Sequence, residues 1–149
     1  MTISPMTGLA SDWRMWALGS AVFAAATALL AKAGVQGVNS NMATLIRTLV
    51  IVPTLLIVLM ATRQFQHPGA ITPRTYLFLA LSGLATGASW LCYFRALQLG
   101  PASRVAPIDK LSVVLVAIAG VLVLGEKLTL GAWMGVALIA AGAVCVAVF

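Results

Sequence analysis

The chain has 149 residues, of which 62% are hydrophobic and only 8% are charged, and its mean hydropathy is +1.07. Globular proteins carry about a quarter charged residues, so a soluble domain of this length cannot hide so much apolar surface, and a lipid bilayer is the expected solvent. The net charge is +6, but the cations are spread singly, without clusters of interleaved aromatics. This excludes nucleic acid as the expected partner and favours interfacial anchoring and topology.

Hydrophobic stretches recur along the chain, and each is near the length of about 20 residues that a spanning helix needs. Ser11 and Asp12 suit the start of the first stretch, as an N-cap and as a carboxylate at a helix N-terminus. We therefore predict an all-α integral membrane bundle, with a short polar segment at residues 1–12 and a five-helix transmembrane domain at residues 13–149. The predicted spans are residues 13–32, 41–61, 75–97, 105–124 and 128–149.

An odd number of spans places the two ends of the chain on opposite sides of the membrane. Lys and Arg in short loops favour the cytoplasmic side. Four such residues lie on the N-terminal side and three on the other, or five when the deeper Arg47 and Lys110 are included. Because this bias is weak, the chain either takes one fixed orientation or inserts both ways and pairs as an antiparallel dimer.

Small residues recur at spacing four within three of the predicted spans, and such stripes let helices approach closely in lipid. The first span carries Ser20, Ala24 and Ala28. Each stripe marks a face on which the helix contacts another helix. For any one stripe, we favour a contact with another helix of the same chain over a contact between two copies of the chain. The glycines of the third and fifth spans that we assign to helix packing are Gly83, Gly87, Gly131, Gly135 and Gly142.

Polar side chains inside the spans are more informative, because their burial in hydrocarbon is costly. They recur at spacings of three and four, so those on one helix share a face. If these faces turn inward, they line a cavity with hydrogen-bonding groups and leave the apolar faces for lipid. The candidates for a substrate path or for coupling are Lys32, Thr44, Arg47, Thr86, Ser89, Trp90, Tyr93, Asp109, Lys110 and Ser112.

Arg47 interrupts the first half of the second span, where a charge costs about 2.5–3.5 kcal/mol on insertion scales. A position about two turns from the interface lowers that cost. Three roles are open for this side chain. It snorkels to the headgroups, pairs with Asp109, or meets an anionic group of a ligand.

Asp109 and Lys110 lie near the start of the fourth span, just after Pro107. Adjacent helical residues point about 100° apart, so we do not expect a good ion pair between them. Asp109 is a partner for the helix dipole, a proton-coupling carboxylate or one half of a salt-bridge gate. Pro107 either begins the helix or kinks it and frees a carbonyl for a ligand.

Several short motifs of this chain occur together in one known family. Residues 31–35 read Ala-Lys-Ala-Gly-Val, and residues 95–103 read Arg-Ala-Leu-Gln-Leu-Gly-Pro-Ala-Ser. Residues 125–129 form a Gly-Glu-Lys-Leu-Thr turn, and the last span contains Leu-Ile-Ala-Ala-Gly at residues 138–142. With this pattern the chain resembles the EamA-type branch of the drug/metabolite transporter superfamily, most closely from Gly83 onward.

The larger members of that superfamily have ten helices in two inverted halves, so the resemblance implies that this chain is equivalent to one five-helix half. It implies a homodimer in a cell membrane, the inner membrane of a bacterium, and an antiparallel pair is the arrangement that restores the inverted repeat. It also implies export or exchange of small metabolites by alternating access.

The small multidrug resistance branch of the superfamily has an essential Glu in its first helix. Residues 13–32 contain no acidic residue, which puts proton-coupled export of hydrophobic cations in doubt. The embedded cations Arg47, Lys32 and Lys110 outnumber the single embedded carboxylate, Asp109. Charge complementarity therefore favours zwitterionic or anionic solutes such as amino acids.

We expect a secondary transporter, with a non-transporting membrane interaction or assembly protein as the alternative. An enzyme is not expected, because the sequence shows no nucleophile–base pair, no His/Glu metal spacing and no phosphate loop. We expect no cofactor and no metal site, since the two cysteines lie in apolar runs without metal-binding spacing. The expected partners are a small-molecule substrate, the bilayer and a second copy of the chain.

Overall fold

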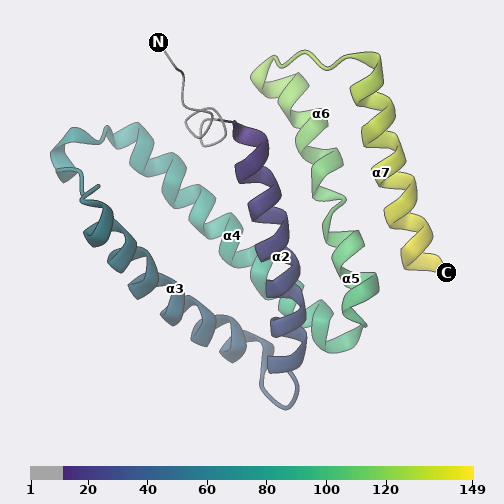
Figure 1. Cartoon of the computed structure of the whole chain (residues 1–149), viewed down its shortest axis with the longest axis horizontal. Helices are drawn as coiled ribbons and strands as arrows, with labels where there is room; N and C mark the ends of the chain where they lie inside the picture. The colour runs from purple at the N-terminus through teal and green to yellow at the C-terminus, as the bar shows by residue number, and fades with distance from the viewer. Residues whose placement is uncertain (1–11) are drawn as a thin grey trace, which may run out of the picture.

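The computed structural model describes residues 12–149, so Ser11 and nearly all of the predicted polar N-terminal segment lie outside the described residues. All long elements of the described part are helices and none is a strand, which confirms the all-α fold class (Figure 1). Five helical stretches are long and apolar enough to cross a membrane. The elements are α2 (Trp13–Gly34), α3 (Ser40–Thr62), the 3₁₀ helix η1 (Pro68–Ala70), α4 (Pro73–Leu99), α5 (Ala102–Asp109), α6 (Ser112–Leu124) and α7 (Leu130–Val148).

Polar residues at the helix starts explain where most of the spans begin. The side chains of Asp12 and Asn39 each accept a hydrogen bond from the backbone N–H two residues later, at the starts of α2 and α3. Thr72 and Thr129 do the same for α4 and α7, with the N–H three residues later. Each cap satisfies a donor that has no partner inside the helix.

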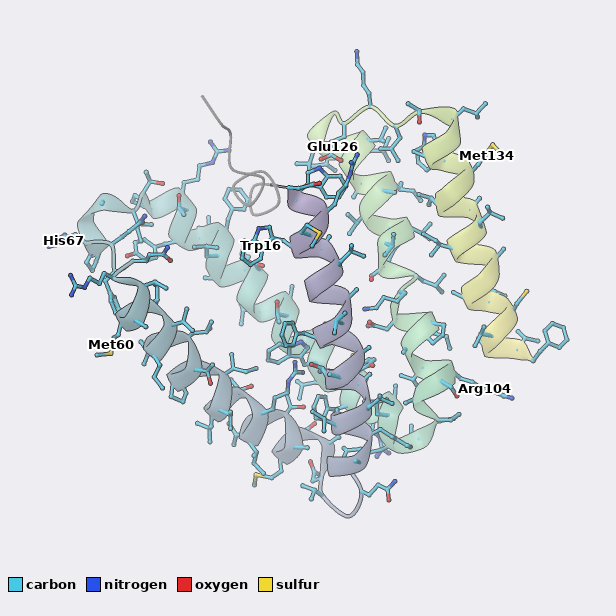
Figure 2. All side chains as sticks on the ribbon, in the orientation of Figure 1. Trp16, Met60, His67, Arg104, Glu126 and Met134 are labelled. Carbon is cyan, nitrogen blue, oxygen red and sulfur yellow. The ribbon has the colours of Figure 1, made fainter. Side chains whose placement is uncertain are left out.

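The helices form two hairpins, α3–α4 and α5/α6–α7, and α2 lies between them and contacts α4 and α5 (Figure 1). The tightest packing is at the end of α2, where Val35, Phe94 and Leu97 form a buried cluster. Elsewhere large apolar side chains point outward, as Met60 and Met134 do in Figure 2. Lipid explains this surface, because acyl chains solvate such side chains as well as a protein core does.

The fourth span is not one continuous helix but is interrupted just after Pro107. Helix α5 ends at Asp109 and α6 begins at Ser112. Across this break the backbone N–H groups of Leu111 and Val113 donate to carbonyls three residues back, which is tighter than an α-helix. Pro107 lies inside α5, so the alternative that it begins the helix is wrong. The break places Asp109 at the end of a helix, inside a span that is long and apolar enough to cross a membrane.

The five glycines assigned to helix packing do not pack within the chain. A Cβ atom added at any of them would meet no heavy atom of another element within 4 Å. The structure therefore gives no support to packing within one chain at these positions. The glycine faces are left open to whatever lies outside the chain, and these residues are Gly83, Gly87, Gly131, Gly135 and Gly142.

Candidate functional site

A cavity of about 190 Å³, called the central cavity below, lies between α2, α3, α4 and α5. Six of the ten residues that the sequence singled out for a substrate path or coupling line it, because each of these helices turns a polar face toward its neighbours. Aromatic, hydroxyl, cationic and anionic groups therefore meet in one place. The walls are Ala24 and Thr27 of α2, Arg47 of α3, Ser89, Trp90 and Tyr93 of α4, Asp109 of α5 and Lys110 just after it.

The guanidinium of Arg47 stacks on two aromatic side chains of α4. Its Cζ atom is 4.1 Å from the centre of the Trp90 ring and 5.7 Å from the centre of the Phe94 ring. Trp90 and Phe94 are one helical turn apart, so both rings face α3. Cation–π contact stabilises the charge but accepts no hydrogen bond in the plane of the guanidinium. Within residues 12–149, Arg47 has no ion pair and no hydrogen bond from its side chain.

This geometry bears on one of the three roles left open for Arg47, the pairing with Asp109. Pairing with Asp109 is not adopted, since the one ion pair in the described part of the chain joins Asp109 to Lys110. The guanidinium lies over the Trp90 ring, and snorkelling of Arg47 to the headgroups stays an alternative. The unpaired guanidinium at the cavity wall is the arrangement suited to an anionic ligand.

Asp109 and Lys110 form an ion pair, contrary to the expectation from their adjacency. Lys110 Nζ lies 3.2 Å from Asp109 Oδ2. The expectation assumed a continuous helix, whereas α5 ends at Asp109 and Lys110 is its C-cap, so the long lysine side chain can turn back. Both side chains stay accessible, with 56% of Lys110 and 35% of Asp109 exposed. The carboxylate is therefore within reach of a ligand's ammonium group.

Tyr93 stands where three cavities adjoin. Besides the central cavity, it lines a cavity of about 240 Å³ beside α5, which Ser89 and Asp109 also line. It lines a third of about 370 Å³ against the alanine-rich face of α2, together with Lys110. Its phenol group thus lies between the Arg47 side and the Asp109 side of the site, where it can donate to or accept from a ligand.

Lys32 does not line the central cavity, and its side chain is engaged at the end of α4. Its Nζ donates to the backbone carbonyls of Leu97 at 2.6 Å and Gly100 at 2.9 Å. These carbonyls lie at the C-terminus of α4, where the last carbonyls lack helical partners and carry the negative end of the helix dipole. Lys32 therefore ties α2 to the end of α4.

Three further candidates lie away from the central cavity. Thr44 is buried, and its hydroxyl donates to the Ser40 carbonyl of its own helix. Thr86 donates to the Ser82 carbonyl in the same way and is exposed. Ser112 is the exposed first residue of α6, one turn beyond Asp109. Hydroxyls within helices satisfy themselves locally, so a polar residue in a span does not by itself mark a cavity.

Sequence reasoning missed two contributors to the site. Thr27 lines the central cavity from α2, one turn from Ala24 in the small-residue stripe, and a hydroxyl on that stripe was the available signal. Phe94 supplies the second ring beside Arg47. Its spacing of four from Trp90 was visible, but an apolar ring carries no signal that separates it from ordinary packing.

Comparisons with known proteins identify the family of the chain. Residues 12–148 match the EamA-like transporter family. The chain belongs to this family. It is also 63% identical over 141 residues to an uncharacterized transporter in the cobO 3′ region of a Sinorhizobium species, a match that covers 95% of this chain and 100% of the relative. No solved structure matches.

Membership of the EamA-like transporter family, together with five helices able to span a bilayer, makes the chain a multi-pass membrane transporter. The central cavity is the place in this EamA-like protein where charged and aromatic groups from four helices meet. It is therefore the candidate site for a transported solute.

The contribution of Lys32 to holding α2 against α4 can be tested by measuring stability. Replacing it (Lys32→Met) removes two charge-assisted hydrogen bonds, so the free energy of unfolding in detergent should fall by about 1.5–3 kcal/mol. The matched control Lys127→Met changes an exposed lysine between α6 and α7 and should leave stability unchanged. Equal stability of the two variants would show that Lys32 does not hold α2 to α4.

Proposed function

We propose that this EamA-like protein is a secondary transporter that exports or exchanges small zwitterionic or anionic metabolites, such as amino acids, by alternating access in a bacterial inner membrane. The observation that carries the proposal is the unpaired guanidinium of Arg47 at the wall of a cavity that also holds a carboxylate. The family and the spans give the coarser conclusion of membrane transport, and this pair of charges supports the proposed class of solute.

The energetics of Arg47 favour a ligand with an acceptor group. A guanidinium inside a span costs several kcal/mol unless its donors find partners, and its stacking on Trp90 returns about 2 kcal/mol at most. A carboxylate accepts two parallel hydrogen bonds from it, which is the strongest pairing that side chains offer an anion. A bound carboxylate would therefore supply the hydrogen-bond acceptor that the Arg47 guanidinium lacks.

The negative charge of Asp109 in the same site favours a zwitterion over a simple anion as the solute. Asp109 lines the same cavity and is paired with a lysine ammonium. An ammonium group of a solute has the same chemistry as Lys110 Nζ and can compete for this carboxylate. Arg47 and Asp109 thus offer complementary charges to the two ends of an amino acid, with Tyr93 between them.

A homodimer is part of the proposal. The five spans bury few side chains among themselves, and the glycine faces of α4 and α7 meet nothing within the chain. Close helix packing in lipid uses such small-residue faces. A second copy, in antiparallel orientation, would cover them, enclose the cavity and supply the other half of an inverted repeat, around which the pair could rock.

The open glycine faces also favour the second candidate, a non-transporting assembly protein that packs against another membrane component. That role needs the glycine faces and does not need a charged cavity. Loss of function on changing Gly135, together with full function after changing Arg47, would select it over transport.

The substrate role of Arg47 predicts a large effect on transport. Removal of the guanidinium (Arg47→Ala) should lower uptake of labelled amino acids into proteoliposomes about 100-fold, because the solute's carboxylate loses its charged partner. The matched control Arg74→Ala, at the exposed start of α4, should retain uptake. Circular dichroism and elution volume should match the wild type for both variants, and unchanged uptake by Arg47→Ala would refute the proposed role.

The dimer predicts a steric effect on one face of α7. A leucine at Gly135 (Gly135→Leu) adds bulk where nothing in the chain clashes, so it should weaken dimerisation in liposomes by about tenfold or more. Ala137→Leu, two residues along the same helix and exposed, is the control and should dimerise normally. Single-molecule photobleaching measures the dimer fraction of each variant. Identical fractions for the two variants would show that this face of α7 is not part of the dimer contact.

A further inference from the structure

A second cavity, called the lateral cavity below, adjoins the central cavity on the other side of Arg47. Its volume is about 360 Å³, and it lies between α2 and α3 beside Phe94. Arg47 and Thr27 line both cavities, so they form a shared wall. The other lining residues are Leu30, Ala31 and Gly34 of α2, Val38 of the following loop, and Ala43 and Ile46 of α3.

The two cavities differ in chemistry. Apart from Thr27 and Arg47, the lateral cavity is lined by aliphatic residues, glycine and the Phe94 ring, whereas the central cavity holds Asp109 and Lys110. A polar group placed in the lateral cavity would lose its hydration without gaining partners, which is costly. The lateral cavity therefore suits an apolar group that extends from something held at Arg47.

We propose that the lateral cavity is the subsite for the apolar part of the transported solute, whose carboxylate binds Arg47. This inference rests on the proposed function and narrows its substrate class. The preferred solutes are carboxylates with an aliphatic or aromatic side chain, and small or strongly polar amino acids leave the lateral cavity unfilled. A zwitterion of this class places its ammonium toward Asp109, its carboxylate on Arg47 and its side chain between α2 and α3.

Arg47 argues for a solute in this cavity over a lipid chain or a helix of a second copy. An acyl chain or an apolar helix would fill the space but would cover the guanidinium with groups that accept no hydrogen bond, and its donors would stay unsatisfied. A ligand with both an apolar group and a carboxylate fills the lateral cavity with the first and accepts hydrogen bonds from the guanidinium with the second. Because Arg47 lines both cavities, a solute whose carboxylate binds Arg47 can place its apolar part in the lateral cavity.

Gly34 allows the lateral cavity to be filled from the protein side. It lines the cavity, a Cβ there meets no heavy atom within 4 Å, and the residue is outside the buried cluster of Val35, Phe94 and Leu97. Gly34→Leu should therefore fill space without breaking packing. Gly19→Leu is the matched control, because Gly19 lies on the same helix, also meets nothing within 4 Å and lines neither cavity.

The experiment measures uptake of labelled leucine and labelled glycine by proteoliposomes of the wild type and the two variants. Wild type should prefer leucine. Gly34→Leu should lower the efficiency of leucine uptake about tenfold relative to glycine, the scale of discrimination that a few methylene groups give. Gly19→Leu should keep the wild-type ratio. Ile46→Ala, which enlarges the lateral cavity, should shift preference toward the larger tryptophan and gives a second readout if Gly34→Leu folds poorly.

The outcomes separate this inference from the function on which it rests. If both solutes are taken up and neither Gly34→Leu nor Ile46→Ala changes the preference among solutes, the subsite is overturned and the proposed transport function is not. An equal loss for leucine and glycine in Gly34→Leu also overturns it, and indicates that lipid or a second copy fills the cavity. A wild-type protein that takes up no amino acid overturns the proposed function, and with it the subsite.

Discussion

A positive charge held inside a membrane span is the constraint around which the rest of this structure is arranged. Arg47 lies within α3, and its guanidinium has no acceptor among the side chains of residues 12–149. The Trp90 ring at 4.1 Å lowers the cost of the charge without meeting its directional donors. In the proposed function, the carboxylate of the transported solute supplies the acceptor that this guanidinium lacks.

Long-range hydrogen bonds and the buried cluster are found together at one end of the helix bundle. Lys32 and Gln98 join α2, the following loop and the end of α4, through bonds from Lys32 Nζ to the Leu97 carbonyl and from Gln98 Nε2 to the Val38 carbonyl at 2.6 Å each. This end also holds the buried cluster. The glycine faces of α4 and α7 stay uncovered. In the proposed dimer, these bonds hold α2 to the end of α4, while the glycine positions of α4 and α7 face the second copy.

Sequence periodicity and the cost of buried polarity were enough to predict the all-α membrane bundle and to bring Arg47, Trp90, Tyr93 and Asp109 to one cavity. The corrections have a common cause, because each depends on geometry between segments distant in sequence or on a local break. Lys32 reaches carbonyls 65 and 68 residues away. Lys110 can pair with its neighbour only because α5 stops there. The open glycine faces follow from how the hairpins are placed, which spacing within one helix does not specify.

The distance between the Arg47 guanidinium and a bound solute tests the central claim most directly. Solid-state NMR dephasing in liposomes, with ¹⁵N-labelled arginine side chains and a solute labelled with ¹³C at its carboxylate, reports this distance. A bidentate pair predicts a ¹³C–¹⁵N separation of about 4 Å or less, with the signal lost in Arg47→Lys. A bound solute that shows no dephasing, or dephasing that persists in Arg47→Lys, would contradict the account.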